Sequence, residues 1–350
     1  MNKSKLKKIT SARLFLPIVC LIAVLLLNVI KTPDFFNVSI RNGVLYGYII
    51  DVINRASELV ILAIGMTLVT AASGGQDISV GAIMAVAAAV CCQILSGGQV
   101  SVNEYQNSII IAVIAALLAS ALCGAFNGFL VARLNIQPMV ATLILYTAGR
   151  SIAAWINNNE LPVVSDKTFT YFGGFIPGIA IPTPFFIAAI CVIITMLALK
   201  FTNLGLYTQS VGINESSSRL NGLNPTFIKF LTFVILGLCV AVVGLIKVSR
   251  LSSINYSVIA KDIEMDAILA VALGGNALSG GKFNMMASIL GAYVIQFLTT
   301  TLYKFNVQSD ALPAYKAVVV IALVVLSAPT VREKLGEFSK KLKPQTKEVG

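Results

Sequence analysis

The glycine-rich segment Gly274–Lys282, GGNALSGGK, is the part of this chain that comes nearest to a known catalytic motif. It can be compared with the phosphate-binding loop GxxxxGK[ST], but Asn276 stands where that motif has its first glycine. Phe283 stands where the motif has the serine or threonine that holds magnesium. The segment therefore does not predict a nucleotide-hydrolysing centre, and any ATP that drives this protein would be hydrolysed by another subunit.

The chain contains no histidine. This excludes His-based catalytic triads, HExxH zinc sites and haem ligation through histidine. The six cysteines all fall inside apolar runs without a CxxC spacing, which is typical of small core residues and not of disulfides or metal ligands. We expect no catalytic residue, no metal and no cofactor in this chain.

Three charged residues lie within or beside apolar segments, where charge is costly and marks functional candidates. Arg150 falls well inside the segment 138–156, and we leave open whether it lines a polar path, forms an ion pair or snorkels to the outer face. Glu264 and Asp266 fall in the first turn of the segment 263–273. Carboxylates stabilise the positive end of a helix, so we favour that capping role for both.

Two glycine-rich turns join apolar segments. In the first, SGGQDISVG (Ser73–Gly81), Asp77 stands just ahead of a hydrophobic segment, where a carboxylate can cap free backbone N–H groups. We favour this structural role over coupling or ligand contact. The second turn is the segment Gly274–Lys282. The candidate turn residues are Gly74, Gly75, Asp77 and Gly81 in the first turn, and Gly274, Gly275, Gly280 and Gly281 in the second.

The composition predicts a membrane protein. Of the 350 residues, 57% are hydrophobic and 12% are charged, with a mean hydropathy of +0.86, whereas soluble domains carry about 25% charged residues. The net charge of +11 arises mainly at the two ends of the chain, beside apolar segments. No basic stripe is interleaved with aromatic residues, so we expect membrane lipid and not nucleic acid as the partner of these charges.

The apolar segments predict an all-α polytopic membrane protein with about ten transmembrane helices, since ~20 apolar residues cross the hydrocarbon core. The eighth segment, 263–273, would rise only ~16 Å, so it could cross only if its helix began near Val258. The stretch 34–58 is expected to be amphipathic and extracellular. The predicted spans are 14–30, 59–72, 78–95, 109–132, 138–156, 184–199, 227–246, 263–273, 285–302 and 312–326.

An even number of crossings places both ends of the chain on the same side of the membrane. Lys and Arg are more numerous in the segments that lie inside when the N-terminus is inside, so we predict that both termini are cytoplasmic. The expected organisation is a cytoplasmic segment 1–13, a transmembrane domain 14–328 and a cytoplasmic tail 329–350.

The polar segment 204–225 separates two long apolar segments, and the same topology places it in the cytoplasm. Gly205, Gly212 and Gly222 make it flexible, and the run Glu215–Leu220 favours a short helix. The segment is longer than the about 2–8 residues that usually link packed helices. We interpret it as the place where a soluble partner grips the membrane protein, with a solvated connector as the alternative.

Several separated stretches resemble one protein family. GGQDISVGAIMA (74–85), GINESSSRLNGLN (212–224) and EMDAILAVALGGNALSGGKFN (264–284) are similar to signature stretches of bacterial sugar ABC-importer permeases of the ribose/xylose/galactose branch. Within that branch, the segments 127–150 and 280–296 look most like the galactofuranose-type permease. The resemblance runs from about residue 59 to residue 326, which is most of the chain.

The resemblance implies a multi-pass permease subunit in the bacterial plasma (inner) membrane, which moves a monosaccharide inward by alternating access. Its implied partners are a cytoplasmic ABC ATPase subunit, a periplasmic or extracellular sugar-binding protein, and a second permease in a homodimer or a paralogous heterodimer. The segment 204–225 would hold the coupling helix that docks in the ATPase. The implied coupling residues are Gly212, Asn214, Glu215, Arg219 and Gly222.

Two departures from the family pattern concern these motifs. Gln76 stands where the family usually has an aliphatic residue, and Ser216–Ser218 replace the commoner alanines of the coupling segment. The solute also stays open: ribose, another pentose or hexose, a nucleoside or a branched amino acid are alternatives. An ion-coupled secondary transporter is less favoured because the spans hold few acidic residues, and a hydrolase lacks the usual base.

Overall fold

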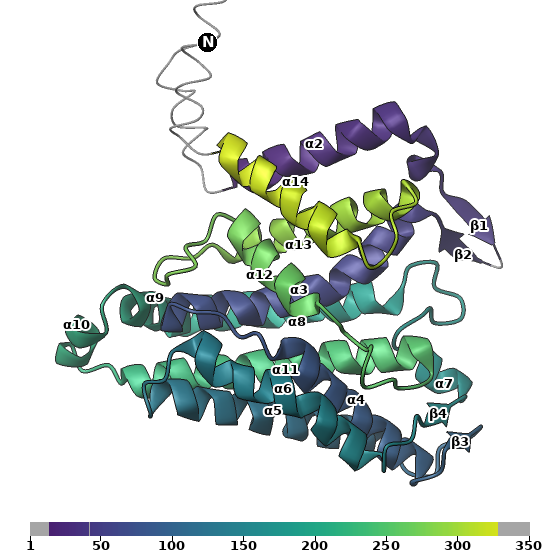
Figure 1. Ribbon diagram of the computed structural model, residues 1–350, viewed down its shortest axis with the longest axis horizontal. Helices are drawn as coiled ribbons and strands as arrows, with labels where there is room; N and C mark the ends of the chain where they lie inside the picture. Colours follow the sequence, from purple (N-terminus) through teal and green to yellow (C-terminus); the bar gives the residue numbers. More distant parts are fainter. Residues whose placement is uncertain (1–13, 42, 328–350) are drawn as a thin grey trace, which may run out of the picture.

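The computed structural model describes residues 14–41 and 43–327, so the predicted cytoplasmic segments 1–13 and 329–350 lie outside it. The described chain is almost entirely α-helical (Figure 1). In chain order its elements are α2 (Phe15–Lys31), η1 (Pro33–Phe36), β1 (Ser39–Arg41), β2 (Val44–Tyr46), α3 (Tyr48–Ser73), α4 (Val80–Ser96), β3 (Ser101–Val102), α5 (Ile109–Ala132), α6 (Pro138–Ile156), β4 (Val163–Val164), α7 (Lys167–Thr170), α8 (Thr183–Phe201), α9 (Leu204–Ile213), α10 (Glu215–Leu220), α11 (Pro225–Leu251), α12 (Ile263–Leu273), α13 (Met285–Lys304) and α14 (Leu312–Ser327).

Helix α3 is the central element of the bundle and packs against α8, α9, α11, α12 and α13. The sequence predicted a helical span from residue 59, but the helix already begins at Tyr48, and the extracellular placement of the stretch 34–58 stays a prediction. The charges that suggested an external stretch do not end the helix. Arg55 is exposed, and the buried Glu58 is bound by two cationic side chains of α11.

Helix α11 packs on α5, α3 and α4, and it crosses α5 at a pair of glycines. A Cβ atom on Gly237 would lie 2.5 Å from the carbonyl oxygen of Ser120 and 3.3 Å from the Cα of Gly124. Only glycine permits this backbone approach, as is common where membrane helices pack. The helix continues to Leu251, beyond the predicted end at residue 246.

Six of the predicted spans correspond to helices that are long and apolar enough to cross a membrane, namely α3, α5, α6, α8, α11 and α13. Three more correspond to the shorter apolar helices α2, α4 and α14. The eighth, α12, has 11 residues and begins at Ile263. Val258 lies in the turns before it, so the earlier start that a full crossing would need is not present.

The two ends of the bundle carry different elements (Figure 1). Helices α9 and α10 lie at one end, which we call the α10 end. The opposite end carries α7, the antiparallel pair β1–β2 and the parallel pair β3–β4. There Asp166 begins α7 by accepting a hydrogen bond from the backbone N–H of Thr168 at 2.7 Å. Hydrogen bonds from Thr168 hold the pKa of Asp166 below its ordinary value.

Candidate functional site

The segment 204–225, predicted as a polar loop with one short helix, contains two helices, α9 and α10. The short helix lies where it was expected, at Glu215–Leu220. Asn214 separates the two helices, because its extended backbone ends α9 and its Oδ1 accepts a hydrogen bond from the backbone N–H of Ser217 at 2.8 Å. An asparagine in this position is a strong helix start signal.

Ion pairs hold α10 on the beginning of α11. Glu215 Oε2 lies 2.5 Å from Lys229 Nζ, and Glu215 Oε1 lies 3.4 Å from Arg219 Nη2 one helical turn away. The far end of α10 is open to its surroundings: Leu220 is 90% exposed and the Arg219 side chain 67%. Gly222 follows in the left-handed conformation with φ +80°, which lets the chain turn back towards α11. Helix α10 is therefore anchored at its beginning through Glu215 and exposes Arg219 and Leu220 at its other end.

Helix α9 connects α10 to the end of α3. A Cβ atom on Gly212 would collide with the carbonyl oxygen of Ala71 and lie 2.7 Å from the backbone nitrogen of Gly281. The backbone N–H of Gly281 donates to that same Ala71 carbonyl at 2.9 Å. A Cβ on Gly280 would also lie 2.9 Å from the Cα of Gly74. The structure thus brings both glycine-rich turns and the segment 204–225 together at the α10 end.

The second glycine-rich turn is fixed on α13 by the residue that breaks the phosphate-loop pattern. Asn276 Nδ2 donates to Ser288 Oγ at 2.7 Å, and Asn276 Oδ1 accepts from the backbone N–H of Asn284 at 2.6 Å. Gly274 packs directly on the backbone of α13, and Gly275 has φ +70°. The turn is a structural connection, because its polar side chain, Asn276, is engaged in hydrogen bonds to the beginning of α13.

Asp77 of the first glycine-rich turn is buried in a small polar cluster. Its Oδ1 accepts from the backbone N–H of Ser79 at 2.8 Å and from Ser79 Oγ, and its Oδ2 accepts from Asn127 Nδ2 at 3.1 Å. The N-terminal cap position of α4 is Ser79 itself. Asp77 therefore binds the backbone just before the helix and ties it to α5, while Gly75 makes room for Pro138 of α6.

Arg150 does not form an ion pair within the described chain. Its Nη1 donates to the carbonyl oxygens of Tyr256 and Ile259, at 2.8 and 2.9 Å. These carbonyls belong to the non-helical segment 252–262 between α11 and α12. The side chain holds backbone of the segment that precedes α12, and its lining of a polar path or snorkelling to the outer face stays a prediction.

The carboxylates of α12 have different surroundings. Glu264 is 2% exposed, and its Oε2 has no hydrogen-bond partner among the described residues. This oxygen lies so close to α4 that a Cβ on Gly81 would come within 2.6 Å of it. Asp266 binds Lys316 of α14, with its two carboxylate oxygens 2.6 and 2.7 Å from the Lys316 Nζ. The favoured capping interpretation misses this ion pair, although both residues do lie in the first turn.

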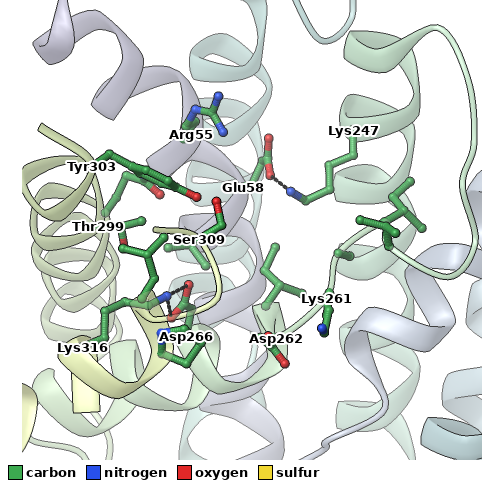
Figure 2. Close-up of a pocket in the computed structure, with 18 of the residues that line it drawn as sticks. Arg55, Glu58, Lys247, Lys261, Asp262, Asp266, Thr299, Tyr303, Ser309 and Lys316 are labelled. Atoms are coloured by element: carbon green, nitrogen blue, oxygen red, sulfur yellow. Dashed lines mark hydrogen bonds and ion pairs between the residues drawn. The ribbon is translucent and has the colours of Figure 1, made fainter. Parts of the chain in front are cut away.

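A cavity of about 1040 Å³ lies between α3, α11, the segment 255–263, α13 and α14 (Figure 2). Glu58 faces it from α3 and is only 3% exposed. Its carboxylate lies 2.8 Å from Lys247 Nζ and also binds Arg250, both on α11. Arg250 in turn donates to the carbonyl oxygen of Gly173 at 3.0 Å. These contacts fix the walls of the cavity at the end opposite α10.

Sequence reasoning did not find this cavity, because it assigned its charges to external loops. Glu58 was placed in the extracellular stretch 34–58, and Lys247 and Arg250 lie beyond the predicted end of the seventh span. A signal was available: charges directly beside an apolar span can belong to the same helix when they have partners on a neighbouring helix. Lys247 and Arg250 are spaced three apart, which places them on one helical face.

A bundle with six helices long and apolar enough to cross a membrane is the architecture of a multi-pass membrane protein. The chain belongs to the family described as branched-chain amino acid transport system / permease component, which matches residues 48–328. No solved structure matches it.

Among curated proteins the chain is similar to sugar permeases. It is 38% identical over 312 residues to the galactofuranose transporter permease protein YtfT of Escherichia coli, covering 89% of this chain and 88% of that protein. It is 36% identical over 352 residues to the fructose import permease protein FruF of Bifidobacterium longum, covering 98% and 96%. The ribose import permease protein RbsC of Escherichia coli is 34% identical over 314 residues, covering 87% and 92%. The resemblance to bacterial sugar permeases, and with it a multi-pass protein of the bacterial inner membrane, is confirmed.

Proposed function

We propose that this chain is the transmembrane permease subunit of an ABC importer that carries a monosaccharide, galactofuranose or a similar simple sugar, by alternating access. The observation that carries the proposal is the similarity over 87–98% of the chain to permeases for three different sugars. The described helices supply a scaffold of the right kind, since six are long enough to cross the membrane. We count about ten crossings, the eighth of them made by the short helix α12 together with the non-helical segment 252–262 before it, and place both termini and the α10 end inside the cell.

In this proposal the energy comes from a partner. A cytoplasmic ABC ATPase subunit hydrolyses ATP, because the segment 274–282 lacks the first glycine and the hydroxyl of a phosphate-binding loop. A sugar-binding protein delivers the solute at the opposite face. A second permease, identical or paralogous, completes the membrane pore.

Helix α10 is the contact with the ATPase. Its support is geometric: a helix anchored through Glu215 and Lys229 presents the exposed Arg219 and Leu220. An exposed apolar side chain beside a cation suits a protein groove with apolar and acidic groups. Motion of α10 passes through α9 to Gly212, and from there to α3, whose other half forms a wall of the cavity.

The proposal is tested with the purified complex, by measuring sugar-stimulated ATP hydrolysis in the wild type, Arg219→Glu and Arg219→Lys. Glutamate reverses the exposed charge and faces Glu215 in the same helix, so stimulation is expected to fall at least about tenfold, as for a charged interface contact worth 1.4 kcal/mol or more. Arg219→Lys keeps the positive charge and is expected to retain most of the sugar-stimulated ATP hydrolysis.

Both variants should reach the membrane in wild-type amounts, because Arg219 is exposed. Identification of the co-eluting subunits completes the experiment. A purified chain without an ATPase partner, or full sugar-stimulated hydrolysis by Arg219→Glu, would contradict the proposal.

A further inference from the structure

We infer that the cavity between α3, α11, α13 and α14 binds the transported solute itself, and that it is built for an uncharged polyhydroxylated molecule. This inference rests on the proposed function and adds the place and the chemistry of solute binding. Within the described chain, the cavity combines four features: its position beside a broken helix, its volume, its nearly balanced charges, and a polar stripe on α13.

The cavity lies beside α12, a helix that is too short to run through the whole bundle. Helix α12 has 11 residues, a rise of ~16 Å, and occupies the side nearer the α10 end. The chain before it is not helical, and Ala260 and Asp262 there have positive φ, at 56° and 63°. Arg150 holds this segment by its carbonyl groups. Broken helices in transporters typically border the solute site near the middle of the membrane.

The volume suits a sugar with water around it. About 1040 Å³ is at the upper end of small-molecule sites, which run from about 300 to 1,000 Å³. A water molecule takes about 30 Å³ of liquid volume, so a monosaccharide leaves room for a hydration layer.

The buried charges of the lining are already paired with one another. Glu58 is bound by Lys247 and Arg250, and Asp266 is bound by Lys316 through both carboxylate oxygens. Figure 2 shows these two groups on different walls, with the space between them. The Glu58 group has one cation more than its carboxylate and the Asp266–Lys316 pair is neutral, so a neutral ligand can enter without breaking a pair.

The remaining charged residues of the lining are balanced in sign. Arg55 and Lys261 are cationic, and Asp262 and Asp310 are anionic. Sites for phosphates or carboxylates gather an excess of cations, and sites for metal ions gather an excess of carboxylates. Over the whole lining five cations stand against four carboxylates, so neither sign is in strong excess, which favours a ligand without net charge.

Helix α13 supplies a stripe of uncharged polar side chains. Gln296, Thr299 and Tyr303 all line the cavity at helical spacings of three and four residues, so they share one face. Ser309 lies beyond the end of the helix on the same side of the cavity (Figure 2). Amide and hydroxyl groups both donate and accept hydrogen bonds, as sugar hydroxyls do. The Tyr303 ring adds an apolar face for a sugar ring.

The test introduces single cysteines into the full importer complex in proteoliposomes and treats it with a membrane-impermeant, charged methanethiosulfonate reagent. Thr299→Cys and Ser309→Cys place the thiol in the cavity. Ser101→Cys is the matched control, because Ser101 is exposed at the same end of the bundle but outside the lining. The wild type reports any reaction of the six native cysteines.

Modification of Thr299→Cys is expected to lower ATP-dependent sugar uptake at least tenfold, and modification of Ser309→Cys at least twofold. Uptake by Ser101→Cys is expected to be unaffected by the reagent. The transported sugar should slow the modification of Thr299→Cys several-fold, and leucine should not. Wild-type uptake after complete modification of both cavity variants would overturn the inference, and protection by leucine alone would overturn the ligand class. Absence of ATP-dependent sugar uptake before any modification would instead contradict the proposed function.

Discussion

Replacement of Gly212 by valine is expected to abolish sugar uptake by the assembled importer, with a loss of at least a hundredfold. Gly212 is where α9 touches the end of α3, and any Cβ there collides with the carbonyl oxygen of Ala71. The same carbonyl accepts the backbone N–H of Gly281, so neither neighbour can give way without losing that hydrogen bond. Valine therefore separates α9 from α3 and breaks the connection between α10 and the cavity wall.

Gly205→Ala is the matched control for this prediction, since it lies on the same helix. A Cβ on Gly205 would lie 3.2 Å from the tip of the flexible Leu199 side chain and 4.0 Å from the Phe283 ring, and would meet no backbone. Uptake by Gly205→Ala should stay within about twofold of the wild type, as for a substitution without a packing conflict. ATP hydrolysis without uptake is the expected signature of Gly212→Val. Normal uptake by that variant would show that α9 does not need to contact α3.

Replacement of Lys316 by methionine is expected to detach α14 from the bundle and to lower both stability and uptake. Lys316 is 8% exposed, and its ammonium group is the partner of Asp266 on α12. Removal of one member of a buried pair leaves a buried charge and costs about 3–5 kcal/mol. The variant should unfold at a clearly lower temperature in detergent, and uptake should fall at least tenfold.

The double variant Asp266→Asn/Lys316→Met separates the charge effect from the loss of size. Replacement of both members of a buried pair by neutral groups is often close to neutral for stability. The midpoint of thermal unfolding should therefore return most of the way to the wild-type value. Equal destabilisation of the single and the double variant would show that the ion pair does not hold α14.

Several features could be predicted from the sequence because they depend on neighbours along the chain. The apolar runs predicted the long helices, and the helix-favouring run Glu215–Leu220 predicted α10. Gly280 and Gly281, with φ of +91° and +95°, were found because few other residues adopt that conformation. The family resemblance followed from the same local motifs.

Other features depend on contacts between distant parts of the chain and could not be predicted this way. Glu58 can lie inside a helix because Lys247 and Arg250, almost two hundred residues later, neutralise it. Arg150 was noticed as a charge inside a predicted span, but its partners are carbonyl groups of a non-helical segment, which no periodicity reveals. Two such groups, Glu58 with its partners and Asp266 with Lys316, line the cavity, and of these residues the sequence singled out only Asp266.

The account depends on this chain being a sugar permease whose conformational change is driven by a separate ATPase subunit that acts through α10. The most direct measurement is uptake of labelled sugar into proteoliposomes that contain the chain with its second permease and binding protein, with and without the ATPase subunit and ATP. Accumulation only when the ATPase subunit and ATP are both present is the predicted result. Accumulation in vesicles that lack the ATPase subunit, driven by an ion gradient, would contradict it.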